Sequence, residues 1–158
     1  MSSSDFSSDV VNFAAFMRLL AAPTPVAPTN TTVQGSNQFV NVGCGGCHIP
    51  QHTTAQSPFG GQSNVTRTPL SDFTLHNMGT GLQDQVSQGA ANGQQFRTAP
   101  LWGLGQRVFF LHDGRTNNLV TAIAAHASQG SEANQVISNF NLLSASDRQA
   151  VIAYLRSL

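Results

Sequence analysis

Apolar residues recur at helical spacing near the N-terminus of this 158-residue chain. Ser7 or Ser8 can cap a helix there, because a serine hydroxyl accepts a hydrogen bond from a free backbone N–H of the first turn. The apolar stripe of this helix consists of Val10, Phe13, Phe16, Met17 and Leu20. Such a stripe is typical of a helix that packs against a core, so we interpret Met17 as a packing residue rather than a metal ligand.

The C-terminal part of the chain shows the same period. Asn117 or Asn118 can cap a helix that runs through His126. Leu119, Ile123 and His126 share one face of that helix. Ser131 is expected to open a further helix, and the segment 144–147 resembles a capping box for a last one. The apolar positions of these two helices are Val136, Ile137, Phe140, Val151, Ile152, Leu155 and Leu158.

Proline and glycine interrupt the pattern between these regions. Segment 22–29 is proline-spaced and should run extended as a linker. We therefore expect residues 1–31 to form an N-terminal helix with a proline-rich linker, and residues 32–158 to form the main domain. A short helix is predicted over 35–42, followed by loop-like sequence over 51–69. No stretch reads as a system of paired strands, which predicts an all-α domain with long loops.

Composition narrows the function classes. The formal net charge is zero and only 9% of residues are charged. The composition therefore gives no excess of basic residues that would attract nucleic acid or an anionic membrane. No apolar run reaches membrane-spanning length. Residues 1–5 lack the basic and apolar regions of a signal peptide.

The two cysteines carry the strongest chemical signal. Cys44, Gly45, Gly46, Cys47 and His48 form the attachment signature of a c-type haem. In that chemistry the cysteines bond to the porphyrin and the histidine ligates the iron. A thioredoxin-type redox pair, a structural disulfide and half of a zinc site are the alternatives. A redox pair would follow a strand within a βαβ unit, and zinc would need a second Cys or His pair. Neither is visible, so we predict one covalent haem c in a cytochrome c-like fold.

Covalent haem attachment normally takes place outside the cytoplasmic membrane. We therefore expect a periplasmic or extracellular protein, with a signal sequence ahead of Met1 in the natural chain. Calcium is a conceivable second cofactor, but no motif indicates it.

The sixth ligand of the iron is open to several side chains. His52 is too close to His48 to reach the opposite face easily, whereas His76 and Met78 lie in a glycine-flanked loop that could approach a haem. Periodicity alone leaves His126 and Met78 about even as ligands. The aromatic and aliphatic segment 96–105, which includes Trp102, is suited to wrapping a haem edge.

Several longer stretches resemble the C-terminal haem domain of the bacterial di-haem oxidoreductases described as putative peroxidases, which are related to the di-haem cytochrome c peroxidases. The resembling segments are 13–18, 44–48, 75–79, 97–105, 111–115 and 154–158. In these relatives the axial residue comes from the helix after the His-Asp-Gly string. The resemblance therefore favours His126 as the sixth ligand over Met78.

The same resemblance suggests roles for four further side chains. His76 and His112 would form hydrogen bonds near the haem. Arg97 and Arg115 would pair with its propionates, because a guanidinium matches a carboxylate in two bonds.

The chain has one haem motif where the family has two. We therefore expect an electron-transfer domain with bis-histidine ligation, and a redox partner protein or an upstream haem domain as its partner. The alternative is a peroxidase-type oxidoreductase whose distal ligand dissociates to admit peroxide. A third possibility is a structural module whose haem mainly holds the fold together.

Overall fold

The computed structural model describes residues 3–158, with side chains described from residue 8 onward. Helices account for most of the regular structure, which confirms the helical part of the predicted fold class. The helices are α1 (Ser3–Leu19), α2 (Asn30–Asn41), α3 (Gly79–Leu82), α4 (Leu119–Ala124), α5 (Asn134–Leu142) and α6 (Ala145–Arg156). Short 3-10 turns occupy η1 (Cys44–Gly46), η2 (Gly60–Gln62) and η3 (Leu104–Gln106).

The expectation that no strands pair was wrong. β1 (His52–Thr53) pairs antiparallel with β2 (Thr66–Arg67), and β3 (Leu75–Asn77) pairs antiparallel with β4 (Gln95–Arg97). In the second pair His76 lies opposite Phe96. Strands of two or three residues are too short to show an alternating pattern, so the sequence could not reveal them.

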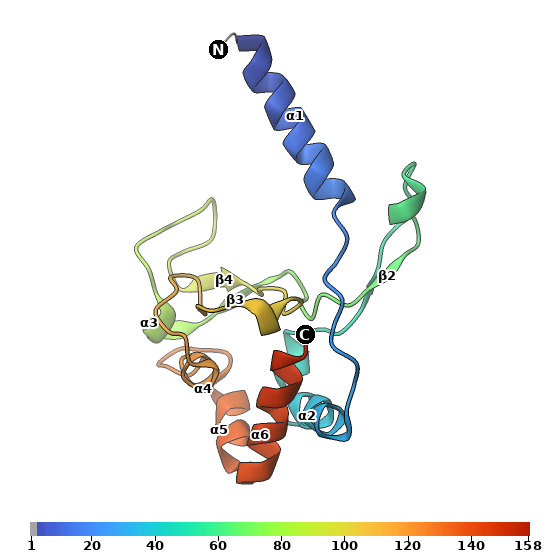
Figure 1. Ribbon diagram of the computed structural model, residues 1–158. Coiled ribbons are helices and arrows are strands. Elements are labelled where there is room, and N and C mark those ends of the chain that lie inside the picture. The colour runs from blue at the N-terminus through green and yellow to red at the C-terminus, as the bar shows by residue number, and fades with distance from the viewer. Residues whose placement is uncertain (1–2) are drawn as a thin grey trace.

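Helices α2, α5 and α6 lie together at the base of the molecule (Figure 1). Gly35 of α2 is buried against α6, where a Cβ atom would collide with the backbone carbonyl of Ala150. Phe39, Phe140, Val151 and Leu155 belong to the core cluster above this contact. A glycine at the crossing therefore lets the two helix backbones approach closely.

Side-chain caps fix where the helices begin. The Thr29 hydroxyl accepts from the backbone N–H of Thr32, so α2 starts earlier than the predicted residue 35. Asn118 caps α4 through Thr121 N, and Ser144 caps α6 through Asp147 N, both as the sequence indicates. These bonds satisfy N–H groups that have no partner within the helix.

Helix α1 extends away from the other helices (Figure 1). Its apolar side chains are more than half exposed, so the expectation that its stripe packs against a core was wrong for the described chain. The exposed residues include Val10, Phe13, Phe16, Met17 and Leu20. The period of an apolar stripe indicates which face seeks a partner, but it does not place that partner in the same chain.

The proline-spaced segment is extended, and it packs on the domain rather than running free. Val26 N donates to Ser157 O at 2.8 Å. Pro23 and Pro25 line a small cavity together with Trp102 and Tyr154. The linker is thus fastened across the C-terminal end of α6.

No helix within residues 3–158 is long and apolar enough to cross a membrane.

Candidate functional site

A cavity of about 350 Å³ lies beside the motif Cys44–His48. Its walls are mainly apolar, and they include Phe39, Phe96, Leu101, Leu104, Phe110, Leu119 and Ile123. Both cysteines of the motif line it, as do His48, His126 and Met78. The fold therefore brings residues from positions 39 to 155 around one apolar space, and such spaces are the usual sites of ligands in proteins.

The cysteine motif forms the tight turn η1. Gly43 precedes it with φ 109°, a backbone angle that favours glycine, and His48 N donates to Cys44 O at 2.9 Å. The thiols are not joined in a disulfide. Burial raises the pKa of Cys44 to about 11 and also raises that of Cys47. Burial therefore favours the protonated thiols over free thiolates in the chain without a bound group.

The two predicted iron ligands, His48 and His126, each form a hydrogen bond from the ring to a backbone carbonyl. His48 Nδ1 lies 2.9 Å from Leu70 O, and His126 Nδ1 lies 2.8 Å from Ala122 O. A neutral imidazole that donates from Nδ1 to a carbonyl presents a lone pair at Nε2. Burial lowers the pKa of both rings, which keeps them neutral. Each ring therefore has the tautomer that a metal ligand requires.

His126 itself does not lie on a helix. Helix α4 ends at Ala124, and His126 follows in a turn in which its N–H donates to Ile123 O. The expected helix through His126 was wrong at its C-terminal end. The next predicted helix, which contains Val136, Ile137 and Phe140, is confirmed as α5, but it begins at Asn134 rather than at Ser131. Ser131 is buried instead, and its hydroxyl donates to His126 O at 2.6 Å. That bond fixes the backbone of His126 and competes with helix continuation.

Met78 stays available as an alternative ligand. It lines the same cavity, and its backbone is fixed by hydrogen bonds with Gln94 and Ser128. The choice between His126 and Met78 remains a prediction.

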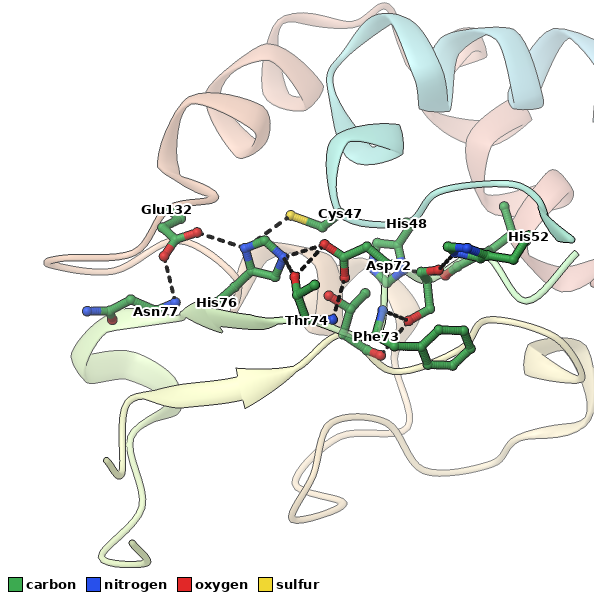
Figure 2. A network of polar contacts seen from close by, with 12 residues as sticks. Cys47, His48, His52, Asp72, Phe73, Thr74, His76, Asn77 and Glu132 are labelled. Atoms are coloured by element: carbon green, nitrogen blue, oxygen red, sulfur yellow. Dashed lines mark hydrogen bonds and ion pairs between the residues drawn. The ribbon is translucent and has the colours of Figure 1, made fainter. Parts of the chain in front are cut away.

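His76 sits between two carboxylates at one edge of the cavity (Figure 2). Its Nε2 lies 2.8 Å from Asp72 Oδ2, and its Nδ1 lies 2.8 Å from Glu132 Oε2. Hydrogen bonds to Glu132 and Asp72 raise the pKa of His76. Hydrogen bonds from Thr74 and His76 outweigh desolvation and lower the pKa of Asp72. Cys47 Sγ lies 3.7 Å from His76 Nδ1, so an imidazole flanked by two carboxyl groups lies beside the attachment motif.

The other predicted site residues divide into two groups. His112 and Arg97 line the cavity, with the His112 ring 4.5 Å from that of Phe96 and its Nε2 3.8 Å from Asp84. Trp102 lines the smaller cavity behind the linker instead. Arg115 pairs with Asp113 at 2.6 Å and donates to Gly81 O, and it is not among the residues that line the main cavity.

Sequence reasoning missed three polar residues that line the cavity: Thr98, Arg107 and Glu132. Thr98 is buried, and its side chain helps to lower the pKa of Asp72. Arg107 follows η3, and Glu132 follows the turn after His126. No short motif marks them, although Thr98 directly follows Arg97 within a segment that resembles the family.

These residues fit a covalently held haem. The thiols are unpaired, two imidazoles present free Nε2 atoms, and the surrounding wall is apolar. Among the described residues no cluster of three or more His, Cys, Asp or Glu side chains could hold a metal ion on its own.

Comparison with known proteins agrees with the site. No curated protein and no solved structure matches the chain. The family described as "Di-haem oxidoreductase, putative peroxidase" matches residues 1–158. The chain therefore belongs to the di-haem oxidoreductase family.

Proposed function

We propose that this chain is a c-type cytochrome domain for electron transfer. Cys44 and Cys47 would hold one haem covalently, and His48 and His126 would ligate its iron. When bound, the haem supplies one-electron ferric–ferrous chemistry, at a lower potential with two imidazoles than with a histidine and a methionine.

The observation that carries this proposal is the matched fixing of two imidazoles in one cavity. Leu70 O and Ala122 O each take up the Nδ1 proton of one ring. Both Nε2 atoms are thereby left as acceptors within a mainly apolar wall. An unpaired buried imidazole costs free energy, so two of them facing one space indicate a shared partner.

The protein's own contribution is to hold these groups and exclude water. Phe39, Leu104 and Phe110 are almost fully buried around the cavity. The ion pairs of His76 join the β3 segment to the turn after His126. Rigid ligands reduce the reorganisation that accompanies a change of charge, which suits electron transfer.

Peroxidase activity is the second candidate, and the family description favours it. It requires His126 to leave its position and an acid–base group nearby. His76 is poorly suited as a base because both of its nitrogens already bind carboxylates. His112, which is exposed and lines the cavity, is the better candidate.

The partner and location follow from the same proposal. A redox partner protein or an upstream haem domain would exchange electrons with this domain. Covalent haem attachment favours a periplasmic or extracellular location.

The test is the spectrum of the full chain produced with a c-type haem attachment system. We expect the haem to stay with the chain after denaturation, and the ferric form to be low-spin with bis-imidazole features. H126A should give a high-spin fraction, whereas M78L should leave the spectrum unchanged. A sulfur-to-iron charge-transfer band that M78L removes would replace His126 by Met78. Peroxide turnover with a small electron donor, lost in H112Q, would favour the second candidate.

A further inference from the structure

The chain contains one tryptophan and one tyrosine, Trp102 and Tyr154. Both are half-buried, and both line the small cavity of about 130 Å³ that the proline-spaced segment covers. Trp102 lies in the turn before η3, whereas Tyr154 lies on α6. The fold therefore brings together, around one small space, the two aromatic side chains that lose a single electron most readily.

Packed rings join Tyr154 to the main cavity. The ring centroids of Tyr154 and Phe39 lie 5.6 Å apart in an edge-to-face arrangement. Phe39 is 4% exposed and lines the main cavity, and its centroid lies 6.1 Å from that of the His48 ring. Rings at these separations are in contact. An electron can therefore tunnel from Tyr154 to His48 through packed side chains, without crossing a water-filled gap.

The phenol of Tyr154 keeps its proton at neutral pH. Burial raises the pKa of Tyr154 above the usual 10.0, and the side chain forms a hydrogen bond with Ser36. A phenol that loses an electron becomes strongly acidic, so the oxidation of Tyr154 releases this proton. Ser36 is half-buried on α2, and its hydroxyl gives the proton a path toward solvent.

We propose that Tyr154 and Trp102 form a one-electron relay between the small cavity and the haem site. It rests on peroxidase activity, the second candidate function, for its oxidant. Reduction of hydrogen peroxide to two water molecules takes two electrons and two protons. One electron comes from the haem iron and the other from Tyr154, which is left as a tyrosyl radical while its phenolic proton passes to water. An external one-electron donor then restores the phenol through Trp102, and the phenol takes up a proton again.

The test treats the loaded full chain with hydrogen peroxide, freezes it rapidly and records the electron paramagnetic resonance spectrum. We expect an organic radical whose spectrum narrows when the chain carries ring-deuterated tyrosine. Because the chain has a single tyrosine, such a signal identifies Tyr154. Y154F should remove the signal and leave the visible spectrum of the resting form unchanged, since phenylalanine keeps the ring that packs against Phe39.

F39L and F140L are a matched pair, because each removes a buried ring of the core cluster. Only Phe39 has its ring between those of Tyr154 and His48. F39L should lower the yield of tyrosyl radical several-fold, and F140L should leave it unchanged. Peroxide consumption without a tyrosyl radical in the unsubstituted chain, or a full yield in F39L, would overturn the relay.

W102F tests the outer end of the relay. The tyrosyl radical should still form in this variant, but ascorbate should remove it several-fold more slowly than in the unsubstituted chain. A rate of removal that W102F leaves unchanged would exclude Trp102 from the relay and overturn the proposal.

The haem-free full chain, with both thiols alkylated, tests the coupling of the two residues without peroxide. Azide radicals made by pulse radiolysis take an electron from Trp102, and the indole N–H proton passes to water. Tyr154 should then return an electron to Trp102, with loss of its own proton and reprotonation of the indole. The absorption band of the tryptophan radical should change into that of the tyrosine radical, at a rate independent of protein concentration.

A rate proportional to protein concentration would show transfer between molecules and would overturn the relay. Y154F is the control, since its tryptophan radical should persist. A loaded chain that peroxide leaves unaltered would remove peroxidase activity as a candidate function. The pulse measurement would then still decide whether Trp102 and Tyr154 are coupled.

Discussion

His76 Nδ1 and Glu132 Oε2 lie 2.8 Å apart although 56 residues separate them in the chain. Glu132 also accepts from the backbone N–H of Asn77 at 2.9 Å. The pair therefore fastens strand β3 to the turn that follows His126. Asp72 completes the arrangement by accepting from the other ring nitrogen of His76.

This arrangement should stabilise the protein most in mildly acidic solution, as the difference between the unsubstituted chain and H76Q measures. The pKa of His76 is raised, so its contribution is complete below the usual 6.5 and is lost as pH rises through its higher folded value. The pKa values of Asp72 and Glu132 are lowered from 3.8 and 4.5, so their contributions are complete above those values and are lost as pH falls further. The contribution of this network to the free energy of unfolding should therefore be largest between about 5 and 6.5.

Urea denaturation across pH 3 to 9 measures that profile. H76Q should flatten both flanks, because it removes the group common to both ion pairs. H52Q is the control, since His52 contacts only the carbonyl of Ser71 and the ring of Phe73. A profile that H76Q leaves unaltered would show that the contacts do not persist in solution.

The crossing of α2 and α6 should not tolerate a side chain at position 35. G35A places a methyl group against Ala150 O, and overpacking of this kind typically costs about 1–3 kcal/mol. Thermal or urea unfolding of the loaded chain measures the loss. G61A is a suitable control, because Gly61 lies outside the attachment motif and a Cβ there meets nothing within 4 Å. Equal stability of the two variants would mean that the helices lie further apart.

The hydroxyl of Ser131 should matter for the position of His126. S131A removes the donor to His126 O and the acceptor for Ala133 N, which leaves buried polar groups without partners at a cost of about 1–3 kcal/mol. We expect lower stability together with an increased high-spin fraction of the ferric haem. S138A removes an exposed hydroxyl bonded to Asn134 O and should change neither quantity.

Replacing Trp102 should lower the stability of the protein without changing the environment of the haem. W102A removes one wall of the small cavity that holds Pro23 and Pro25, so we expect a loss of about 2 kcal/mol for a partly buried aromatic residue. The visible spectrum of the loaded chain should stay unchanged. L104A is the comparison, because Leu104 lines the main cavity and its loss should alter both stability and spectrum.

The sequence by itself determined the chemistry and the helical class. The five-residue motif needs no long-range information, because its spacing alone brings two thiols and one imidazole together. The caps Asn118 and Ser144 are equally local, since each acts on an N–H three residues away. Family resemblance suggested roles for His76, His112, Arg97 and Arg115 and favoured His126 over Met78. All of these residues except Arg115 line one cavity in the structure.

Only the tertiary structure decided which groups share that cavity and how they are held. The carbonyls of Leu70 and Ala122 set the tautomers of two histidines, and a carbonyl carries no signal in its residue type. Arg97, Arg107 and Arg115 are the same type of residue. Only the tertiary structure shows that Arg115 forms an ion pair with a carboxylate, whereas Arg97 and Arg107 form none within the described residues. Contacts across 22 or 56 residues depend on how the chain folds back, and local spacing contains no measure of that.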